Sequence, residues 1–176
     1  MISPTKTILL LRHGKSDWDA PYGGDHQRPL AQRGVRAARH VGDWLTRIGQ
    51  PPDLVLTSDA ARALATAELA AEAGGWTCPI ERRPDFYSSQ IGTLLGALKA
   101  LDEEITTVLL AGHQPTWSAT VATLTGGGNV HFPTAAVACL DYHGSWPALD
   151  AGRCALRWLV NGKLLAKATN KDTPTN

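Results

Sequence analysis

Apolar residues along the chain gather in short runs separated by stretches of helical periodicity. Three runs, at 6–11, 53–57 and 106–111, are nearly continuous in leucine, isoleucine, valine and other small or apolar residues. Such runs are typical of strands buried on both faces of a sheet. Each run ends in small or polar residues that open a helix-like stretch, and this alternation predicts an α/β fold with a mostly parallel central sheet.

The stretches between the runs predict four helices, at 35–48, 60–73, 91–101 and 116–125. In the first, apolar residues recur at helical spacing while arginines and an aspartate fill the other positions, as in a helix that covers a sheet. Ser58 or Asp59 is the expected N-cap of the second helix. We therefore expect helices around the sheet in a three-layer α/β/α sandwich.

The C-terminal third changes character. The ranges 135–142 and 154–160 read as two strands joined by an irregular, glycine-containing connection, and they are expected to form an antiparallel addition to the sheet. No internal repeat or linker divides the chain. We expect one domain over residues 1–166 and a flexible tail over 167–176.

Composition narrows the function classes. With 176 residues and 43% hydrophobic content, the chain can bury one well-covered core. A formal net charge of +1 and the lack of a lysine- or arginine-rich block argue against broad binding of nucleic acid or acidic lipid, so anion recognition should be local. Three widely spaced cysteines, no long apolar run and no signal-peptide pattern favour a cytoplasmic protein that does not enter membranes, with a monomer as the default.

Residues able to do chemistry follow the predicted strands. Arg12 and His13 come after the first, His113 comes after the third, and Arg62 lies in the first turn of the helix after the second. Taken singly, each could be an ordinary solvated arginine or loop histidine. Because open α/β sheets bind ligands at the carboxyl ends of their strands, the four side chains are expected to converge. Two arginines, two histidines and helix N-termini suit a phosphoryl group.

Four sequence blocks then carry a resemblance to a known family. They are Leu-Arg-His-Gly-Lys-Ser-Asp-Trp at 11–18, Arg-Pro-Leu-Ala-Gln-Arg-Gly at 28–34, Thr-Ser-Asp-Ala-Ala-Arg-Ala-Leu-Ala-Thr-Ala at 57–67 and Gly-His-Gln-Pro at 112–115. In this order they resemble the SixA-like phosphohistidine phosphatases, a small-domain branch of the phosphoglycerate-mutase-like histidine phosphatase superfamily. The resemblance extends over most of residues 5–160 and implies a phosphoglycerate-mutase-like fold.

The resemblance also implies a mechanism and a set of roles. His13 would attack phosphorus and form a phosphohistidine intermediate, while Arg12, Arg62 and a protonated His113 would hold the phosphoryl oxygens; we call these four residues the catalytic box. A neutral imidazole suits the nucleophilic role because its pKa lies near 6.5. The further residues expected to bind substrate are Gly14, Ser16, Trp18, Arg28 and Gln114.

Glycine and tryptophan neighbours of the box carry their own expectations. A side chain at Gly14 is expected to crowd the phosphate or block a special backbone conformation, although an ordinary turn glycine is the alternative. Most of the tryptophans should be packing residues, but Trp18 and Trp117 follow catalytic blocks closely enough to wall the pocket. Lys15 is expected to be peripheral.

The sequence offers no clear acid to protonate a leaving oxygen. Asp85 is the foremost candidate, and Asp17, Asp19 and Asp25 are others. Without such an acid a phosphohistidine substrate is favoured, because its imidazole can leave neutral when the other ring nitrogen is protonated. The short segment between Trp18 and Leu30 would leave the site open to a protein-borne substrate.

The sequence also allows two other functions. They are a phosphatase for a small phosphomonoester metabolite and a non-catalytic phosphate-binding module. The scattered histidines and cysteines have no ligand spacing, so we expect no metal and no cofactor.

Overall fold

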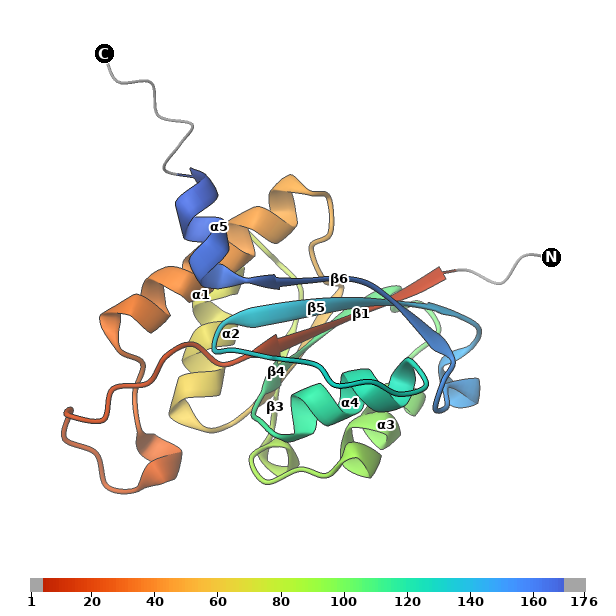
Figure 1. The fold of residues 1–176 in the computed structure, drawn as a ribbon, viewed down its shortest axis with the longest axis horizontal. Helices are drawn as coiled ribbons and strands as arrows, with labels where there is room; N and C mark the ends of the chain where they lie inside the picture. The colour runs from red at the N-terminus through yellow and green to blue at the C-terminus, as the bar shows by residue number, and fades with distance from the viewer. Residues whose placement is uncertain (1–4, 170–176) are drawn as a thin grey trace, which may run out of the picture.

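A six-stranded sheet forms the centre of the protein, whose computed structural model describes residues 5–169, with side chains through Leu165 (Figure 1). The strand order is β3-β2-β4-β1-β5-β6. The strands are β1 (Thr5–Arg12), β2 (Leu54–Ser58), β3 (Ile80–Arg83), β4 (Thr107–Gly112), β5 (Ala136–His143) and β6 (Cys154–Asn161). The α-helices are α1 (Gln32–Arg47), α2 (Ala61–Gly74), α3 (Ile91–Lys99), α4 (Thr116–Leu124) and α5 (Gly162–Thr169), and short 3-10 turns occur at η1 (Asp25–Gln27), η2 (Pro84–Phe86) and η3 (Trp146–Ala148).

Strand directions match the predicted α/β class. β1 pairs parallel with β4, and β2 lies between β4 and β3 and pairs parallel with both. β5 pairs antiparallel with β1, and β6 pairs antiparallel with β5, which confirms the expected C-terminal addition. The carboxyl ends of β1, β2 and β4 therefore meet at one edge of the sheet, where the register sets Arg12 beside Gly112.

Alternation along the strands divides the core into two layers. In β1, Ile8 and Leu10 belong to the cluster that packs on α3 and α4. Leu9 and Leu11 point to the opposite face and pack with residues of α1, α2 and α5. All four side chains are fully buried. The sheet is thus covered on both faces, as the three-layer prediction requires (Figure 1).

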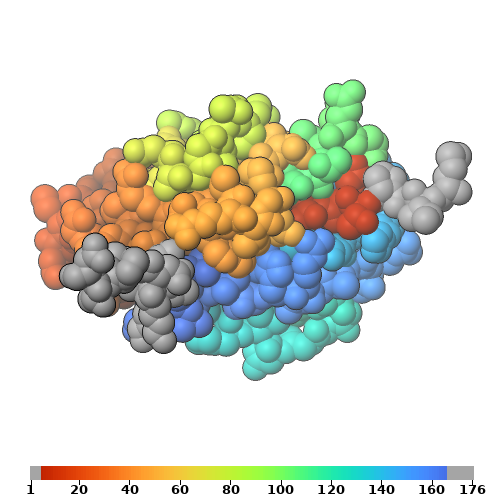
Figure 2. Space-filling model, turned by 90° about the horizontal axis from the view of Figure 1, so that it is seen from above, coloured from red at the N-terminus to blue at the C-terminus, as the bar shows by residue number. Residues whose placement is uncertain are grey.

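Two elements lie outside the ranges that the hydrophobic pattern predicted. β3 is a short edge strand of mostly polar sequence, so no apolar run in the sequence predicts it. α5 follows β6 directly and packs on α1, and Figure 2 shows the orange α1 segment beside the blue β6 and α5 segment. The helix continues into the first residues of the predicted tail 167–176, and the remainder of that tail lies outside the described residues.

Helix α2 corrects the predicted N-cap. Its cap residue is Ala60, which makes no side-chain cap, while Ser58 stays in β2. The Ser58 hydroxyl accepts a hydrogen bond from the Ala60 amide at 3.2 Å. Ser58 therefore closes the turn between strand and helix from a position inside the strand end, and it remains buried beside the catalytic box.

The cysteines match their expected role as unpaired residues. Cys139 and Cys154 are buried, Cys78 is half-buried, and all three carry free thiols. Burial raises the pKa of the Cys139 thiol to about 11, so it stays protonated at neutral pH. In the described part of the chain, no helix has the length and apolar character needed to cross a membrane.

Candidate active site

The edge formed by the ends of β1, β2 and β4 brings the two strand-end histidines together. The His13 amide donates to the Gly112 carbonyl at 3.0 Å, which continues the β1–β4 pairing beyond the strands. The ring centroids of His13 and His113 lie 5.1 Å apart. Both imidazoles are 8% exposed, so they sit at the base of the site with limited access to water.

The hydrogen bond of His13 fixes which ring nitrogen can react. Nδ1 lies 2.7 Å from the Gly14 carbonyl oxygen. A carbonyl can only accept, so Nδ1 must carry the proton and donate it. In the neutral ring, Nε2 then keeps its lone pair and is the nucleophilic atom.

Electrostatics keep His13 neutral. Burial lowers the pKa of His13 to about 4, against a smaller raising effect of the Gly14 carbonyl. The positive charges of Arg62, Arg12 and Arg28 lower this pKa further. At neutral pH the ring is therefore a free base, which is the state that nucleophilic attack requires.

His113 differs from the sequence expectation of a protonated side chain. Burial lowers its pKa to about 3, and His13 and Arg62 contribute in the same direction. Its Nε2 lies 2.9 Å from the Ser58 hydroxyl. If Ser58 donates its hydroxyl proton to Nε2, the neutral ring carries its own proton on Nδ1. His113 can therefore donate to a phosphoryl oxygen without a positive charge.

Each of the two arginines in the box donates hydrogen bonds from part of its guanidinium group to the protein. Arg12 donates from Nη1 to the Phe132 carbonyl at 2.8 Å. Arg62 donates from Nη1 to the Asp25 carbonyl at 2.6 Å and from Nη2 to Asp25 Oδ2 at 2.9 Å. Arg62 is 5% exposed. These contacts orient the two guanidinium groups and leave other N–H groups for a ligand.

Unpaired buried polar atoms are concentrated in the box. Among the described residues, the buried side-chain nitrogen and oxygen atoms without a hydrogen-bond partner are Arg12 Nε, Arg62 Nε, His113 Nδ1 and Thr120 Oγ1. The first three belong to the catalytic box. Buried polar groups normally find partners, so three unpaired nitrogens in one site indicate a ligand that supplies several acceptor oxygens. A phosphoryl group meets this requirement.

Asp25 and Tyr87 also belong to the site, in roles that the sequence did not predict. The Tyr87 hydroxyl donates to Asp25 Oδ2 at 2.8 Å, and the Tyr87 ring stands edge-on to the His113 ring with centroids 5.6 Å apart. The hydrogen bond from Tyr87 lowers the pKa of Asp25 to about 2, and Arg28 and Arg62 contribute. Asp25 is therefore an ionised partner of Arg62, and as such it cannot supply a proton.

Ser16, Trp18 and Arg28 gather beside Asp25. Arg28 is 6% exposed and donates to the Ser16 hydroxyl, while its Nε and Nη2 donate to Asp25 Oδ1 at 3.1 and 2.8 Å. Trp18 is 61% exposed, and the Arg28 guanidinium carbon lies 3.6 Å from its ring centroid. These contacts hold the segment between β1 and α1 in place next to the box. Direct binding of substrate by these side chains stays a prediction.

Gly14 is explained by backbone packing. A Cβ at Gly14 would lie 2.9 Å from the Gly34 carbonyl oxygen, and a Cβ at Gly34 would lie 2.2 Å from the Lys15 carbonyl oxygen. The two backbones thus approach too closely for side chains, and no positive φ is involved at Gly14. Its amide donates to the Thr66 hydroxyl at 2.9 Å. The expected crowding therefore comes from the start of α1.

Gln114 and Trp117 have structural partners that differ from the expected roles. The Gln114 side chain accepts from the Ser118 amide at 2.9 Å and donates to the Ser118 hydroxyl at 3.1 Å, so it caps the first turn of α4. Trp117 is fully buried and donates to the Leu110 carbonyl at 3.3 Å. A Cβ at Gly112 would lie 2.1 Å from the Trp117 ring. Trp117 is a core residue, and Gly112 makes room for it.

Asp85 does not fit the role of proton donor. It forms a two-pronged ion pair with Arg83, at 2.9 and 2.7 Å, and its side chain is 47% exposed. The hydrogen bond from Arg83 lowers the pKa of Asp85, so the carboxyl group is ionised at neutral pH. Asp17 accepts from the Asp19 amide at 3.0 Å in a local turn. The segment that carries Asp85 does reach the box, through Tyr87 two residues later.

Metal ligands do not gather in this site. Over the described residues, no group of three or more histidine, cysteine, aspartate or glutamate side chains is placed to hold a metal ion. The guanidinium groups of Arg12, Arg28 and Arg62 supply positive charge near His13.

Two histidines and two arginines thus lie together where the parallel strands β1, β2 and β4 end, in an α/β protein whose unpaired buried donors suit an anionic ligand. The sequence profile of the histidine phosphatase superfamily (branch 1) matches residues 8–111. A Mycobacterium leprae (strain TN) protein of uncharacterised function is 34% identical over 152 residues, which cover 80% of this chain and 92% of the relative. The chain belongs to the histidine phosphatase superfamily.

Solved structures agree with this assignment. The protein histidine phosphatase SixA in complex with tungstate is 26% identical, with a TM-score of 0.79 over 90% of this chain and 99% of the SixA chain. A structure from Nakamurella multipartitia that carries the name phosphohistidine phosphatase SixA is 28% identical, with a TM-score of 0.77 over 92% and 98% of the two chains. The protein is therefore a SixA-like member of the superfamily.

Proposed function

We propose that the protein is a phosphohydrolase that removes phosphate from phosphohistidine on another protein, through a phosphohistidine intermediate on its own His13. The observation that carries this proposal is the set of buried, unpaired nitrogens on Arg12, Arg62 and His113 beside a neutral His13 whose Nε2 is free to react. Similarity to the SixA structures supports the choice of substrate class.

The first chemical step forms the intermediate. His13 Nε2 attacks phosphorus and forms the new P–N bond, while the P–N bond of the substrate breaks and its electron pair returns to the departing imidazole. That imidazole leaves neutral if its other nitrogen carries a proton. The ring of His13 becomes positively charged, and the Gly14 carbonyl, which accepts from Nδ1 at 2.7 Å, stabilises this charge.

The guanidinium groups act on the transferring phosphoryl group. The N–H groups of Arg12 and Arg62 that are not used by Phe132 and Asp25 can bind its equatorial oxygens. His113 can donate from Nδ1 to a third oxygen. In the second step water attacks phosphorus, the bond to Nε2 breaks, and His13 returns to its neutral form as phosphate leaves.

The carboxylates near the box support a leaving group that needs no acid. Asp25 is held ionised by Tyr87, Arg28 and Arg62, and Asp59 accepts from His26 Nε2 at 2.8 Å. An alkoxide would need a proton from a group of this kind, whereas imidazole would not. Within the described residues, the environment of the box thus favours phosphoramidates over unactivated esters.

A donor comparison tests the proposal. Wild-type protein and His13→Ala would be incubated with a phosphotransfer domain that carries phosphohistidine and with a panel of small metabolite phosphates; His131→Ala, at an exposed histidine, is the matched control. We expect rapid loss of phosphate from the phosphotransfer domain with wild type and with the control, and none with His13→Ala. A clear preference for one metabolite would instead assign a small-molecule phosphatase. No turnover of any donor would assign a phosphate-binding module.

The proposal includes three further properties of the protein. They are independence from metal ions, a cytoplasmic location and a monomeric state. Activity retained after dialysis against EDTA checks the first, and sedimentation velocity checks the last.

A further inference from the structure

A pocket lined by positive side chains lies beside the catalytic box, and we call it the second pocket because it is separate from the site at His13. It has a volume of about 540 Å³ and lies between the N-terminal half of α1, the first turn of α5 and the loop before β5. Its lining includes Lys15, Arg33, Arg36, His40 and Lys163, with no acidic residue, and none of the four box residues takes part. The volume falls in the range of pockets that bind small molecules.

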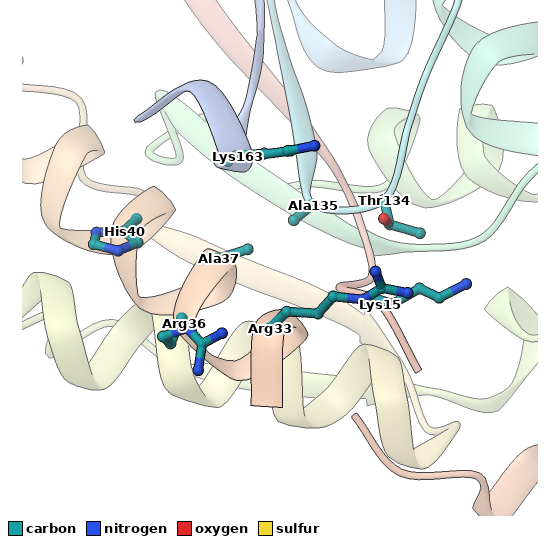
Figure 3. Close-up of a pocket in the computed structure, with 9 residues that line it drawn as sticks. Lys15, Arg33, Arg36, Ala37, His40, Thr134, Ala135 and Lys163 are labelled. Atoms are coloured by element: carbon teal, nitrogen blue, oxygen red, sulfur yellow. The ribbon is translucent and has the colours of Figure 1, made fainter. Parts of the chain in front are cut away.

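The close-up in Figure 3 shows how these side chains are arranged. Arg33 and Lys15 extend along one side of the pocket, and Lys163 extends from α5 on the other. Ala135 and Thr134 lie between them, and His40 lies further along α1. A ligand in the pocket would therefore meet cations from two directions.

Among the described residues, these cations have no side-chain partner. In the described part of the chain, Lys15, Arg33, Arg36 and Lys163 form no ion pair and no side-chain hydrogen bond. Other arginines of the same helix are paired: Arg39 contacts Glu72 at 2.9 Å, and Arg47 pairs with Asp43. The positive charge on the pocket is thus not balanced by any acidic side chain that the structure describes.

Placement of the cations works against helix stability. Arg33 and Lys163 are the second residues of α1 and α5, and neither helix has an acidic residue in its first turn. A helix N-terminus carries positive partial charge, so acidic residues are favoured there and cations are unfavourable. Both helices carry their cations where they repel the dipole, and a bound anion would remove that repulsion.

Backbone contacts connect the pocket to the nucleophile. The Ala135 amide donates to the His13 carbonyl at 3.1 Å, and the Ala135 carbonyl accepts from the Gly162 amide at 3.0 Å. Ala135 has a φ of 56°, which is uncommon for a residue other than glycine. Through these two backbone hydrogen bonds, Ala135 connects the start of α5 to His13 at the end of β1.

We propose that this pocket is a second anion site, separate from the phosphoryl site at His13, and that it binds a small molecule with two or more phosphate groups. Cations on opposite sides of one hollow suit a ligand with several separated negative charges. A flat acidic protein surface would leave a hollow of this size unfilled. This proposal does not depend on the reaction proposed for His13, because none of the residues that line the pocket belongs to the box.

Binding of tripolyphosphate to ¹⁵N-labelled protein at low salt tests the proposal. We expect the amide signals of Lys15, Ala37, Ala135 and Lys163 to shift in a saturable way. The double variant Arg33→Glu/Lys163→Glu should weaken this binding by roughly tenfold or more, because two attractive charges become repulsive. The substitutions place acidic residues at helix N-termini, so both helices should still form.

The matched control is Lys99→Glu/Arg153→Glu, which changes the net charge equally at cations outside the pocket. It should bind tripolyphosphate within roughly twofold of wild type. The proposal is wrong if the shifts are confined to residues of the box, or if both double variants lose affinity equally. It is also wrong if a poly-glutamate peptide shifts the pocket amides while tripolyphosphate does not, since that result would assign an acidic protein partner.

Discussion

Lowering the pH tests the physical state of the nucleophile. The protein is titrated from pH 7.5 to pH 4, and the protonation of the His13 imidazole is measured at each pH. Burial, aided by Arg62, Arg12 and Arg28, lowers the pKa of His13 to about 4 from an ordinary value of 6.5. At pH 5.5 a histidine with the lowered pKa is still almost entirely neutral, whereas an ordinary one is roughly 90% protonated.

The lowered pKa of His13 also gives the free-energy cost of protonating its imidazole in the folded protein. For an imidazole that is 8% exposed, a fall from 6.5 to about 4 corresponds to about 3 kcal/mol between the two protonation states. Protonating both rings is harder still, because two charges at the His13 to His113 centroid distance of 5.1 Å repel by about 3 kcal/mol at an effective dielectric constant of 20. The two rings should therefore titrate as a coupled pair.

Proton binding to His13 makes the free energy of unfolding depend on pH. Below pH 6.5 the unfolded chain binds protons at His13 that the folded chain does not, so the free energy of unfolding falls as the pH drops from 6.5 towards 4. Well above pH 6.5, where the imidazole is neutral in both the folded and the unfolded chain, His13 makes no pH-dependent contribution. Urea unfolding at several pH values should show this decline beyond what His13→Gln, which does not titrate, shows under the same conditions.

Histidine ¹⁵N NMR measures the pKa and the tautomer together. We expect His13 to show a protonated Nδ1 and an unprotonated Nε2 from pH 7.5 down to about 5, with urea-unfolded protein as the reference for an ordinary histidine. Titration of His13 near 6.5, or a proton on Nε2 at neutral pH, would refute the assignment of Nε2 as the ready nucleophile.

Three substitutions test other parts of the structure. Asp85→Asn should leave kcat unchanged in steady-state assays, because its carboxylate is exposed and ion-paired, and a large loss would restore it as the proton donor. Asp25→Asn should tighten inhibition by tungstate roughly fivefold, because it removes a negative charge beside Arg62 that repels an anion in the box; weaker inhibition would show that the charge is needed to position the guanidinium. Gly112→Ala should lower the free energy of unfolding by about 2 kcal/mol, because its Cβ would overlap the Trp117 ring, and unchanged urea unfolding would contradict this packing.

The parts of the fold and site that could be predicted from sequence are the local ones. The apolar runs that became β1, β2 and β4 are buried on both faces, so their composition alone marks them. His13 and His113 lie within one residue of strand ends, and parallel strands bring such ends to one edge of a sheet. The convergence of the box then follows from topology.

The remaining features depend on contacts between distant segments. Tyr87 reaches Asp25 across 62 residues of sequence, and nothing in the pattern around either residue signals that contact. Gly14 looked like a glycine that faces phosphate, but its neighbour is the backbone of Gly34. The second pocket likewise exists only because α5, which the pattern missed, places Lys163 opposite Arg33.

Trapping the phosphoenzyme tests whether His13 Nε2 is the nucleophile. Wild-type protein mixed with a phosphohistidine-bearing donor and quenched in alkali should carry one phosphate that is stable to alkali and labile to acid. Mass spectrometry and ³¹P NMR should place it on Nε2 of His13, because Nδ1 is held by the Gly14 carbonyl. Phosphate on Nδ1 or on another residue, or hydrolysis of donor with no phosphoenzyme in rapid-quench samples, would show that His13 Nε2 is not the nucleophile.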